Sequence, residues 1–437
     1  MELKTFRGGI HPPYQKEATA GKATEDISLP TEVVISMQQH VGAPNQATVK
    51  VGDRVEVGQK IGSSEAFISA PAHASVSGTV KAVEERKNFT GASVACVVIS
   101  VDPGQPGKFT DTRDVSNLTP EQIREIAKEA GLVGLGGAAF PSYVKLAPPK
   151  GKSIDTVIIN GCECEAFLTC DHRLMLERPD DLIKGLKLMM KAVGAERGII
   201  GIEANKMDAA DLLSAKLSGE PGLEVSVLEV KYPEGAEKML IDAITGRRVP
   251  PGKLPSEVGV LVQNAQTAVA LYDAAATGKP VIERVITVTG PGIKNPRNIN
   301  VKVGTPIAHV IEQCGGIIGN PGKVIMGGPM TGFAQKDLSA SVVKGTSGIV
   351  VLPAEAVEES AEQQCVGCNK CGDVCPMFLM PNFIVKQAKR GRWNLTEKYG
   401  ANDCFECGCC SYVCPARIRH IAYVRKAKAE LAAAAKK

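Results

Sequence analysis

Eight cysteines in the carboxyl-terminal part of the chain follow one spacing twice. The first run reads Cys365-x2-Cys368-x2-Cys371-x3-Cys375-Pro376, and the second reads Cys404-x2-Cys407-x2-Cys410-x3-Cys414-Pro415. With this spacing, three thiolates of a short loop reach three irons of one cubane cluster, and the cysteine before the proline reaches the neighbouring cubane. The pattern therefore predicts two [4Fe-4S] clusters that lie close together and pass single electrons.

Crossed ligation divides the eight cysteines into two sets. Cluster 1 takes Cys365, Cys368, Cys371 and Cys414, and cluster 2 takes Cys404, Cys407, Cys410 and Cys375. Zinc is the alternative, because Cys-x2-Cys pairs also bind zinc. Two repeated four-cysteine runs that end in proline fit a pair of zinc sites poorly, so we favour iron and sulfur. Cys409 is off the spacing and is expected to be a spare thiol.

The composition is that of an ordinary soluble protein with several domains. The 437 residues suggest about three domains, and the net charge of +4 argues against a dedicated nucleic-acid-binding protein. The start of the chain lacks the apolar run of a signal peptide, so we expect a reducing cytosol. The remaining cysteines are then free thiols: Cys96, Cys162, Cys164, Cys170, Cys314 and Cys409. No run approaches the ~20 apolar residues of a membrane helix, so work at a membrane would require a partner.

A glycine-rich loop is the second stretch with chemical meaning. It reads Gly134-Leu135-Gly136-Gly137-Ala138-Ala139-Phe140-Pro141-Ser142-Tyr143-Val144-Lys145. Glycines let backbone N–H groups form a concave nest for phosphate, and Lys145 adds a positive charge. The loop is neither a dinucleotide Gly-x-Gly-x-x-Gly motif nor a Walker loop, because the spacing and the flanking residues differ. A plain turn remains the alternative for this loop taken alone.

Two carboxylates follow a predicted strand. Ile154 to Ile159 reads as a strand, and Asn160-Gly161-Cys162-Glu163-Cys164-Glu165 comes directly after it. Ligands of α/β proteins bind at the carboxyl ends of sheet strands. The sequence therefore favours a ligand site here, with solvated surface carboxylates as the alternative.

Four regions differ in their pattern of apolar residues. Residues 1–112 alternate apolar and polar residues between glycine turns, and they resemble the flattened β-sandwich of lipoyl and biotinyl carriers without the modified lysine. Residues 113–280 alternate strands with helices, the first capped by Thr119, and predict an α/β fold with a largely parallel sheet. Residues 281–353 predict a small α+β module. Residues 354–437 predict a helical two-cluster domain that begins with a helix from Ala354 to Gln364.

The motifs together resemble a known family. The loop from Gly134 is similar to the glycine-rich loop of the NADH- and FMN-binding flavoprotein subunit of respiratory complex I. Further similar motifs follow in the same order: Asn160 to Glu165, Tyr232 to Lys238, Asn264 to Thr267, and then a β-grasp-like (SLBB) module. Phe6 to Pro13, Gln39 to Pro44 and the double-cluster tail narrow the resemblance to RnfC, a peripheral subunit of the membrane-bound Rnf complex.

The resemblance implies a flavin site and a nucleotide site. FMN is expected on the loop from Gly134 through Gly136, Gly137 and Ala138 to Lys145, with Asn160, Glu163 and Asn264 lining its pocket. NADH is expected to stack on the flavin near Phe140, with Glu165 and Glu237 as contacts. This chain departs from the family pattern in three places: Leu135 stands for an arginine, Ala166 for a proline, and Glu234 to Glu237 lacks an adjacent glutamate pair.

The implied function is electron transfer within a complex. The resemblance implies a ferredoxin:NAD+ oxidoreductase in which electrons pass between NAD(H), FMN and the two clusters, coupled by partner subunits to Na+ or H+ translocation. The expected partners are other Rnf subunits, both integral membrane and ferredoxin-like, and no nucleic acid. The expected place is the cytoplasmic side of the inner membrane, held peripherally. A flavin joins two-electron to one-electron carriers, so no side chain is predicted to act as an acid or base.

Two other functions stay open at this point. A soluble cobalamin reductase of the propanediol-utilisation type has similar modules. A non-catalytic electron-wire subunit would keep the clusters and lack nucleotide binding, which the departures at Leu135 and Ala166 allow.

Overall fold

Short strands with alternating buried side chains build the first domain. The structure, a computed structural model, describes residues 3–107, 109–357 and 360–435. One sheet has the order β2-β8-β7-β4 and a second has the order β3-β5-β6. The strands are β2 (Glu32–Ser36), β3 (Gln46–Ala47), β4 (Arg54–Val55), β5 (Lys60–Ser63), β6 (Ala72–His73), β7 (Gly78–Lys87) and β8 (Ser93–Val101). Val33, Ile35 and Ile99 are fully buried between the sheets, so the predicted β-sandwich is confirmed.

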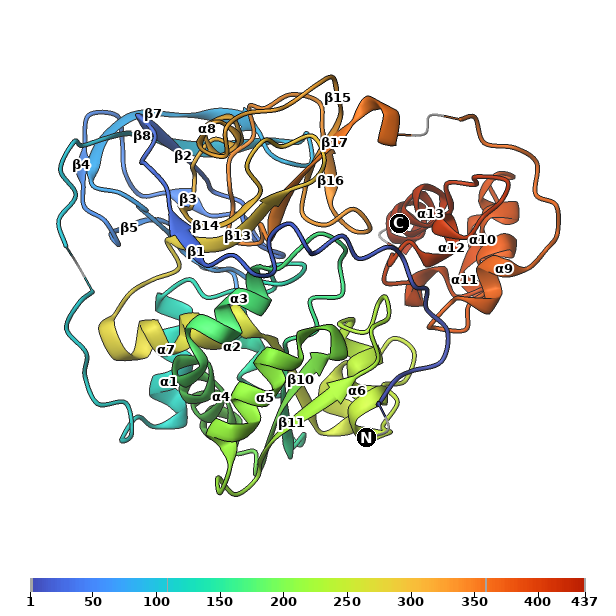
Figure 1. The fold of residues 1–437 in the computed structure, drawn as a ribbon, viewed down its shortest axis with the longest axis horizontal. Coiled ribbons are helices and arrows are strands. Elements are labelled where there is room, and N and C mark those ends of the chain that lie inside the picture. The colour runs from blue at the N-terminus through green and yellow to red at the C-terminus, as the bar shows by residue number, and fades with distance from the viewer. Residues whose placement is uncertain (1–2, 108, 358–359, 436–437) are drawn as a thin grey trace.

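The first residues do not join this sandwich. Residues 3–26, which we call the N-terminal strap, cross the other domains and end in β1 (Thr24–Asp26), a strand of a later sheet. Figure 1 shows the strap (dark blue) passing the carboxyl-terminal domain before it reaches β1. The Gly9 N–H donates to the Val374 carbonyl over 2.9 Å, and Ile10 bridges to Tyr232. The strap has no hydrophobic period, because its partners are distant in sequence.

A parallel sheet forms the centre of the second domain. Its order is β11-β10-β9-β12, and every neighbouring pair is parallel, as predicted. The strands are β9 (Thr156–Asn160), β10 (Arg197–Glu203), β11 (Leu223–Leu228) and β12 (Val260–Asn264). The helices are α1 (Pro120–Glu129), α2 (Ser142–Lys145), α3 (Cys170–Glu177), α4 (Pro179–Val193), α5 (Met207–Leu217), α6 (Glu237–Thr245) and α7 (Ala265–Thr277), with single 3-10 turns η1 (Ala204–Lys206) and η2 (Pro255–Val258).

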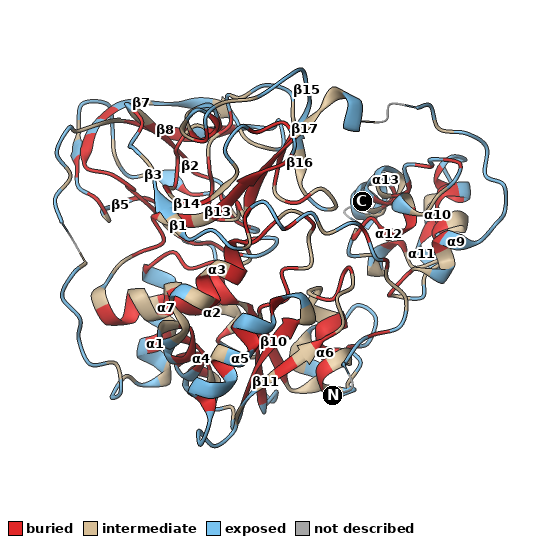
Figure 2. Ribbon diagram, viewed as in Figure 1, coloured by how far each residue is buried: buried red, intermediate tan, exposed pale blue. Residues whose placement is uncertain are grey.

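Local sequence signals explain how this domain begins. The Thr119 side chain accepts from the Gln122 N–H, and the Gln122 side chain caps the Thr119 backbone in return, which is a complete capping box before α1. Val157, Ile158 and Ile159 of β9 are all fully buried, because helices cover both faces of the sheet. Figure 2 shows this band of buried residues (red) along the central strands.

A mixed sheet and one helix form the α+β module. The sheet order is β1-β14-β13-β17-β15-β16, with β1 of the strap at its edge, parallel to β14. The elements are β13 (Glu283–Thr289), β14 (Arg297–Lys302), α8 (Ile307–Gln313), β15 (Pro321–Met326), β16 (Phe333–Gln335) and β17 (Gly348–Pro353). The helix and the strands together agree with the small α+β module predicted for residues 281–353.

Four short helices and one longer helix build the described part of the cysteine-rich domain, which Figure 1 shows set to one side of the others. They are α9 (Lys370–Asp373), α10 (Pro381–Ala388), α11 (Trp393–Lys398), α12 (Cys409–Tyr412) and α13 (His420–Ala435), with a 3-10 turn η4 (Ala401–Asp403). The predicted helix from Ala354 to Gln364 is wrong, since only the turn η3 (Ala354–Ala356) forms in its described part. That stretch has few apolar side chains to bury, and propensity alone does not hold a short helix. Within the described ranges, no helix combines the length and the apolar composition needed to cross a membrane.

Close contact between α4 and α7 gives a test of this fold. Gly185 of α4 lies against the backbone of α7, where an added Cβ would overlap the Ala268 carbonyl oxygen. Gly185→Ala should therefore lower the free energy of unfolding by about 1–3 kcal/mol despite the better helix propensity of alanine. Chemical denaturation measures this change. Lys187→Ala on the same helix, whose side chain is 46% exposed, is the control and should change stability by less than ~0.5 kcal/mol. An equal response of both variants would contradict the close packing.

Candidate functional site

Polar side chains meet at the carboxyl edge of the parallel sheet. Asn160 ends β9, Asn264 ends β12, and the two stand opposite one another in the register of the pair. Glu203 ends the neighbouring strand β10. This is the edge at which α/β proteins bind ligands, so the structure places the strand-end residues where the sequence led us to expect a site.

The glycine-rich loop closes over this edge. The Gly134 N–H donates to the Phe140 carbonyl over 2.9 Å, and Gly136, Gly137 and Ala138 between them are exposed. Gly136 touches the side chain of Asn264 so closely that a Cβ would overlap it. The loop therefore needs glycine at this position, and its exposed residues let a ligand approach the backbone.

Lys145 and Glu237 are brought together. Lys145 lies in α2 and Glu237 begins α6, and the Lys145 ammonium forms an ion pair with the Glu237 carboxylate. The same ammonium donates to the Val262 carbonyl over 2.7 Å. Lys145, predicted to bind phosphate, is thus paired with Glu237, which was predicted to contact the nucleotide.

Asn264 is held by a carboxylate that the sequence prediction missed. The Asn264 Oδ1 accepts from the Gln266 N–H at the start of α7, and its Nδ2 donates to Asp171 Oδ2 over 2.6 Å. Gln266 Nε2 donates to the other oxygen of Asp171 over 2.9 Å. Burial, and next the nearby Glu163, raise the pKa of Asp171 to about 6. In the sequence, the one sign of a role for Asp171 is its position at the start of α3, shortly after the strand-end motif Asn160 to Glu165.

The predicted acidic residues are held by protein groups. Glu163 accepts from the N–H groups of Asp171 (2.8 Å) and His172 (3.2 Å) in the first turn of α3. Glu165 accepts from the N–H groups of Met330 (3.0 Å) and Thr331 (2.8 Å) of the α+β module. Burial raises the pKa of Glu165. Both carboxylates therefore fix the loop that follows β9.

Two buried lysines fix the same loop from its inner side. Lys16 of the N-terminal strap donates to the carbonyl oxygens of Glu163 (2.9 Å), Glu165 (2.9 Å) and Leu168. Lys206 donates to the Cys162 carbonyl over 2.6 Å and pairs with the buried Glu203 over 3.2 Å. Burial lowers the pKa of Lys16. No sequence pattern pointed to either lysine.

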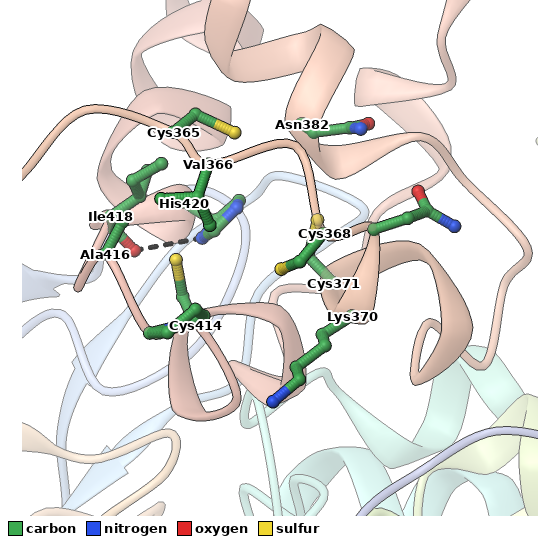
Figure 3. Close-up of a pocket in the computed structure, with 12 residues that line it drawn as sticks. Cys365, Val366, Cys368, Lys370, Cys371, Asn382, Cys414, Ala416, Ile418 and His420 are labelled. Carbon is green, nitrogen blue, oxygen red and sulfur yellow. Dashed lines mark hydrogen bonds between the residues drawn. The ribbon is translucent and has the colours of Figure 1, made fainter.

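The cysteines of cluster 1 line one pocket. Figure 3 shows Cys365, Cys368 and Cys371 of the first run and Cys414 of the second run around a common space. Cys365 and Cys368 are exposed, whereas Cys371 is buried and its pKa is raised by burial. The His420 ring contacts the Ile418 carbonyl over 2.9 Å on the pocket wall. The four thiols that spacing assigned to cluster 1 are thus brought together.

The cysteines of cluster 2 also lie together. Burial raises the pKa of Cys404 to about 11, and the neighbouring thiols of Cys407 and Cys375 add smaller contributions in the same direction. Burial likewise raises the pKa of Cys410, with Cys407, Cys404 and Cys375 as neighbouring charges. Buried thiols in such number cannot all ionise against one another, so this donor set fits a metal cluster that would take up their charge.

The two cysteine runs repeat the same backbone. Residues at equivalent places of the two runs share a positive φ: Gly367 (71°) with Glu406 (64°), Asn369 (59°) with Gly408 (84°), and Phe378 (55°) with Arg417 (53°). Left-handed residues turn the chain back, so that successive cysteines face one point. The repeat provides two matching ligand loops.

Tyr232 connects the two sites. Its hydroxyl donates to the carbonyl of Cys407 over 2.7 Å, and its backbone pairs with Ile10 of the strap. Beyond Tyr232 in the chain, the Gly235 carbonyl accepts from Asn160 Nδ2 over 2.7 Å. A short stretch of chain therefore joins a strand-end residue of the glycine-rich site to a cysteine of cluster 2.

Four family models match the chain in the order in which the domains occur. They are described as the RnfC Barrel sandwich hybrid domain (residues 4–104), the Nuo51 FMN-binding domain (127–273), the SLBB domain (285–334) and the 4Fe-4S dicluster domain (364–418). The chain thus carries an FMN-binding domain and a dicluster domain, and the donor groups described above fit both cofactors.

Two relatives match over nearly their whole length, and both are subunits of ferredoxin:NAD(+) oxidoreductase complexes. The relative from the Na(+)-translocating complex of Acetobacterium woodii is 46% identical, with 99% of this chain and 98% of the relative covered. The relative from the proton-translocating complex of Clostridium ljungdahlii is 41% identical, with 99% and 95% covered. A crystal structure of NAD+-reducing [NiFe]-hydrogenase in the H2-reduced state shares the fold over 74% of this chain and 62% of that chain, with a TM-score of 0.50 and 17% identity.

Double cysteine variants test the crossed ligation. If Cys375 serves the second run, Cys375→Ser combined with Cys404→Ser should spare cluster 1 and leave about four irons per chain after anaerobic reconstitution. Cys375→Ser combined with Cys365→Ser should damage both clusters and leave fewer. Iron analysis and electron paramagnetic resonance of the reduced protein measure this difference. The control Cys409→Ser should keep both clusters, and the reverse order of the two double variants would contradict crossing.

Removal of one hydroxyl tests the Tyr232 contact. Tyr232→Phe keeps the ring but leaves the buried Cys407 carbonyl without its donor, which should cost about 1–3 kcal/mol. Hydrogen exchange of residues 404–410 should then be faster than in the unmodified protein. Tyr412→Phe, at a residue 50% exposed, is the matched control and should leave exchange unchanged. Equal exchange in all three proteins would mean that this bond does not hold the cysteine-rich domain in place.

Proposed function

The chain belongs to the RnfC family, whose members are subunits of ion-translocating ferredoxin:NAD(+) oxidoreductase complexes, and from that premise we propose that it exchanges electrons between NAD(H) and its partner subunits. One observation carries the proposal. The same chain holds a glycine-rich loop at the carboxyl edge of a parallel sheet and two crossed cysteine sets, joined through the Tyr232–Cys407 hydrogen bond.

We propose that the glycine-rich loop holds the flavin. Gly136, Gly137 and Ala138 are exposed in a loop that the Gly134–Phe140 hydrogen bond closes, so their backbone is accessible to a phosphate. Asn160 and Asn264 line the edge below the loop. FMN supplies, when bound, the conversion between hydride transfer from a nicotinamide and single-electron transfer to clusters.

We assign the nucleotide contacts to the rim of the same edge. Phe140 is partly exposed beside the loop and offers a ring for stacking. Glu237 shares the ammonium of Lys145, so a phosphate that approaches this lysine competes with the Glu237 carboxylate. Glu165 and Glu163 shape the pocket because their carboxylates accept hydrogen bonds from backbone N–H groups and so fix the loop after β9. These residues bind and orient, and none is assigned proton transfer.

The two cysteine sets have different surroundings. Cys407 is buried against Tyr232 and Cys410 is also buried, whereas Cys365 and Cys368 are exposed. We propose that cluster 2 faces the flavin and that cluster 1 faces the partner. The partners would be ferredoxin-like and integral membrane subunits, which move Na+ or H+, and the chain would sit peripherally on the cytoplasmic side of the membrane.

Addition of NADH to the reconstituted protein tests the function. With iron, sulfide and FMN restored anaerobically, NADH should bleach the flavin absorbance and then the broad cluster absorbance. Protein that carries clusters without FMN is the control and should respond to dithionite and not to NADH. Clusters that dithionite reduces but NADH leaves oxidised, with FMN present, would make the chain an electron wire and place the nucleotide site on a partner.

A further inference from the structure

A buried arginine of the α+β module has no ion-pair partner. Arg284 of β13 is 2% exposed, which makes it the largest fully buried side chain among the described residues. In the part of the chain that the structure describes, no carboxylate lies within ion-pair distance of it, and its Nη1 has no hydrogen-bond partner. Asp171 is near enough for its charge to act on Arg284, but a buried guanidinium with an unsatisfied N–H group destabilises a protein and calls for a role beyond packing.

Arg284 reaches from its own module to the glycine-rich loop. Its Nη2 donates to the carbonyl of Leu135 over 2.7 Å, and its Nε donates to the Thr346 carbonyl over 3.2 Å. On the other side, the Leu135 N–H donates to the Thr267 hydroxyl over 2.9 Å. The residue before Gly136 is therefore fixed through both of its backbone polar groups, next to the exposed residues of the loop.

Arg284 also acts on the loop through Asp171. Its positive charge opposes the burial and the Glu163 charge that raise the pKa of Asp171. Ionised Asp171 accepts from both Asn264 and Gln266, and the Asn264 side chain touches Gly136. The charged, titratable and amide groups that face Asp171 are Glu163, Cys170, Arg284, Asn264 and Gln266. A single guanidinium therefore stabilises the loop from two directions.

We propose that Arg284 is a positioning residue for the flavin loop of the neighbouring domain. It fixes the Leu135 carbonyl directly, and it keeps Asp171 able to accept from Asn264. This inference rests on the proposed function, in which the loop binds FMN. Its consequence is that FMN affinity depends on the docking of the α+β module.

The pH dependence of FMN binding separates this role from packing. The full chain would be titrated with FMN, and binding followed by quenching of flavin fluorescence, from about pH 5.5 to about pH 8.5. Asp171 supports the loop only when ionised, so affinity of the unmodified protein should fall as the pH drops through about 6. In Arg284→Met the pKa of Asp171 rises further, so the fall should begin at higher pH. At pH 7 the variant should bind FMN roughly tenfold or more weakly.

Three further variants complete the test. Arg284→Lys restores the charge and should return the pH profile partly to that of the unmodified protein, and it carries the test if Arg284→Met does not fold. Asp171→Asn should remove the fall near pH 6. Lys344→Met is the matched control, because Lys344 is the other fully buried cation of the module and holds the Gly131 and Pro71 carbonyls over 2.7 Å each. It should leave the Asp171-dependent fall in place.

The outcomes are distinct. A uniform loss of affinity at every pH in Arg284→Met, equal to that in Lys344→Met, would reduce Arg284 to a packing residue and overturn the proposal. Unchanged FMN binding in Arg284→Met would overturn it as well. If the unmodified, folded protein binds no FMN at any pH, the proposed function itself fails, and the positioning role falls with it.

Discussion

The site at the carboxyl edge of the parallel sheet depends on the hydrogen bonds that the Lys16 ammonium donates. Its three N–H groups meet three carbonyl oxygens, those of Glu163, Glu165 and Leu168, so the donor capacity of the lysine is filled at the cost of burying its charge. These carbonyls belong to the loop after β9, whose carboxylates accept from the first turn of α3 and from the α+β module. Lys16 lies on the N-terminal strap, which is bound in turn to the cysteine-rich domain at Val374 and to the α+β module through β1. Through Lys16, the loop after β9 is therefore linked by the strap to the cysteine-rich domain and to the α+β module.

Three other parts of the chain supply groups to the edge of the parallel sheet that carries the glycine-rich loop. The α+β module gives Arg284 and the N–H groups of Met330 and Thr331, and the strap gives Lys16. The β-sandwich contributes the Val41 N–H, which approaches the Ala139 carbonyl of the glycine-rich loop to 3.4 Å. Several domains thus contribute residues to the site, and the way in which these domains pack together sets its geometry. This arrangement suits an electron carrier, because transfer requires fixed distances between groups held in different domains.

The sequence predicts those parts of the site that depend on interactions between residues close together in the chain. Cysteine spacing predicts the two metal loops because ligands close together in the chain must face one point, and the glycines before Lys145 predict a turn that leaves N–H groups free. The parallel sheet follows from the alternation of strands and helices. Lys16, Asp171 and Arg284 escape prediction because each acts through carbonyls or amides distant in the chain, which leave no period or motif. The helix expected after Ala354 fails for the opposite reason, since favourable local composition has no surface to pack against.

The crossing of the cysteine runs has a consequence for how the protein is made. With Cys414 as the fourth ligand of the first cubane, neither cubane can be completed until the ribosome has made the second run. The β-sandwich and the parallel-sheet domain are by then already synthesised and able to fold. Completion of either cubane therefore follows the synthesis of every residue that the Tyr232 side of the cysteine-rich domain contacts.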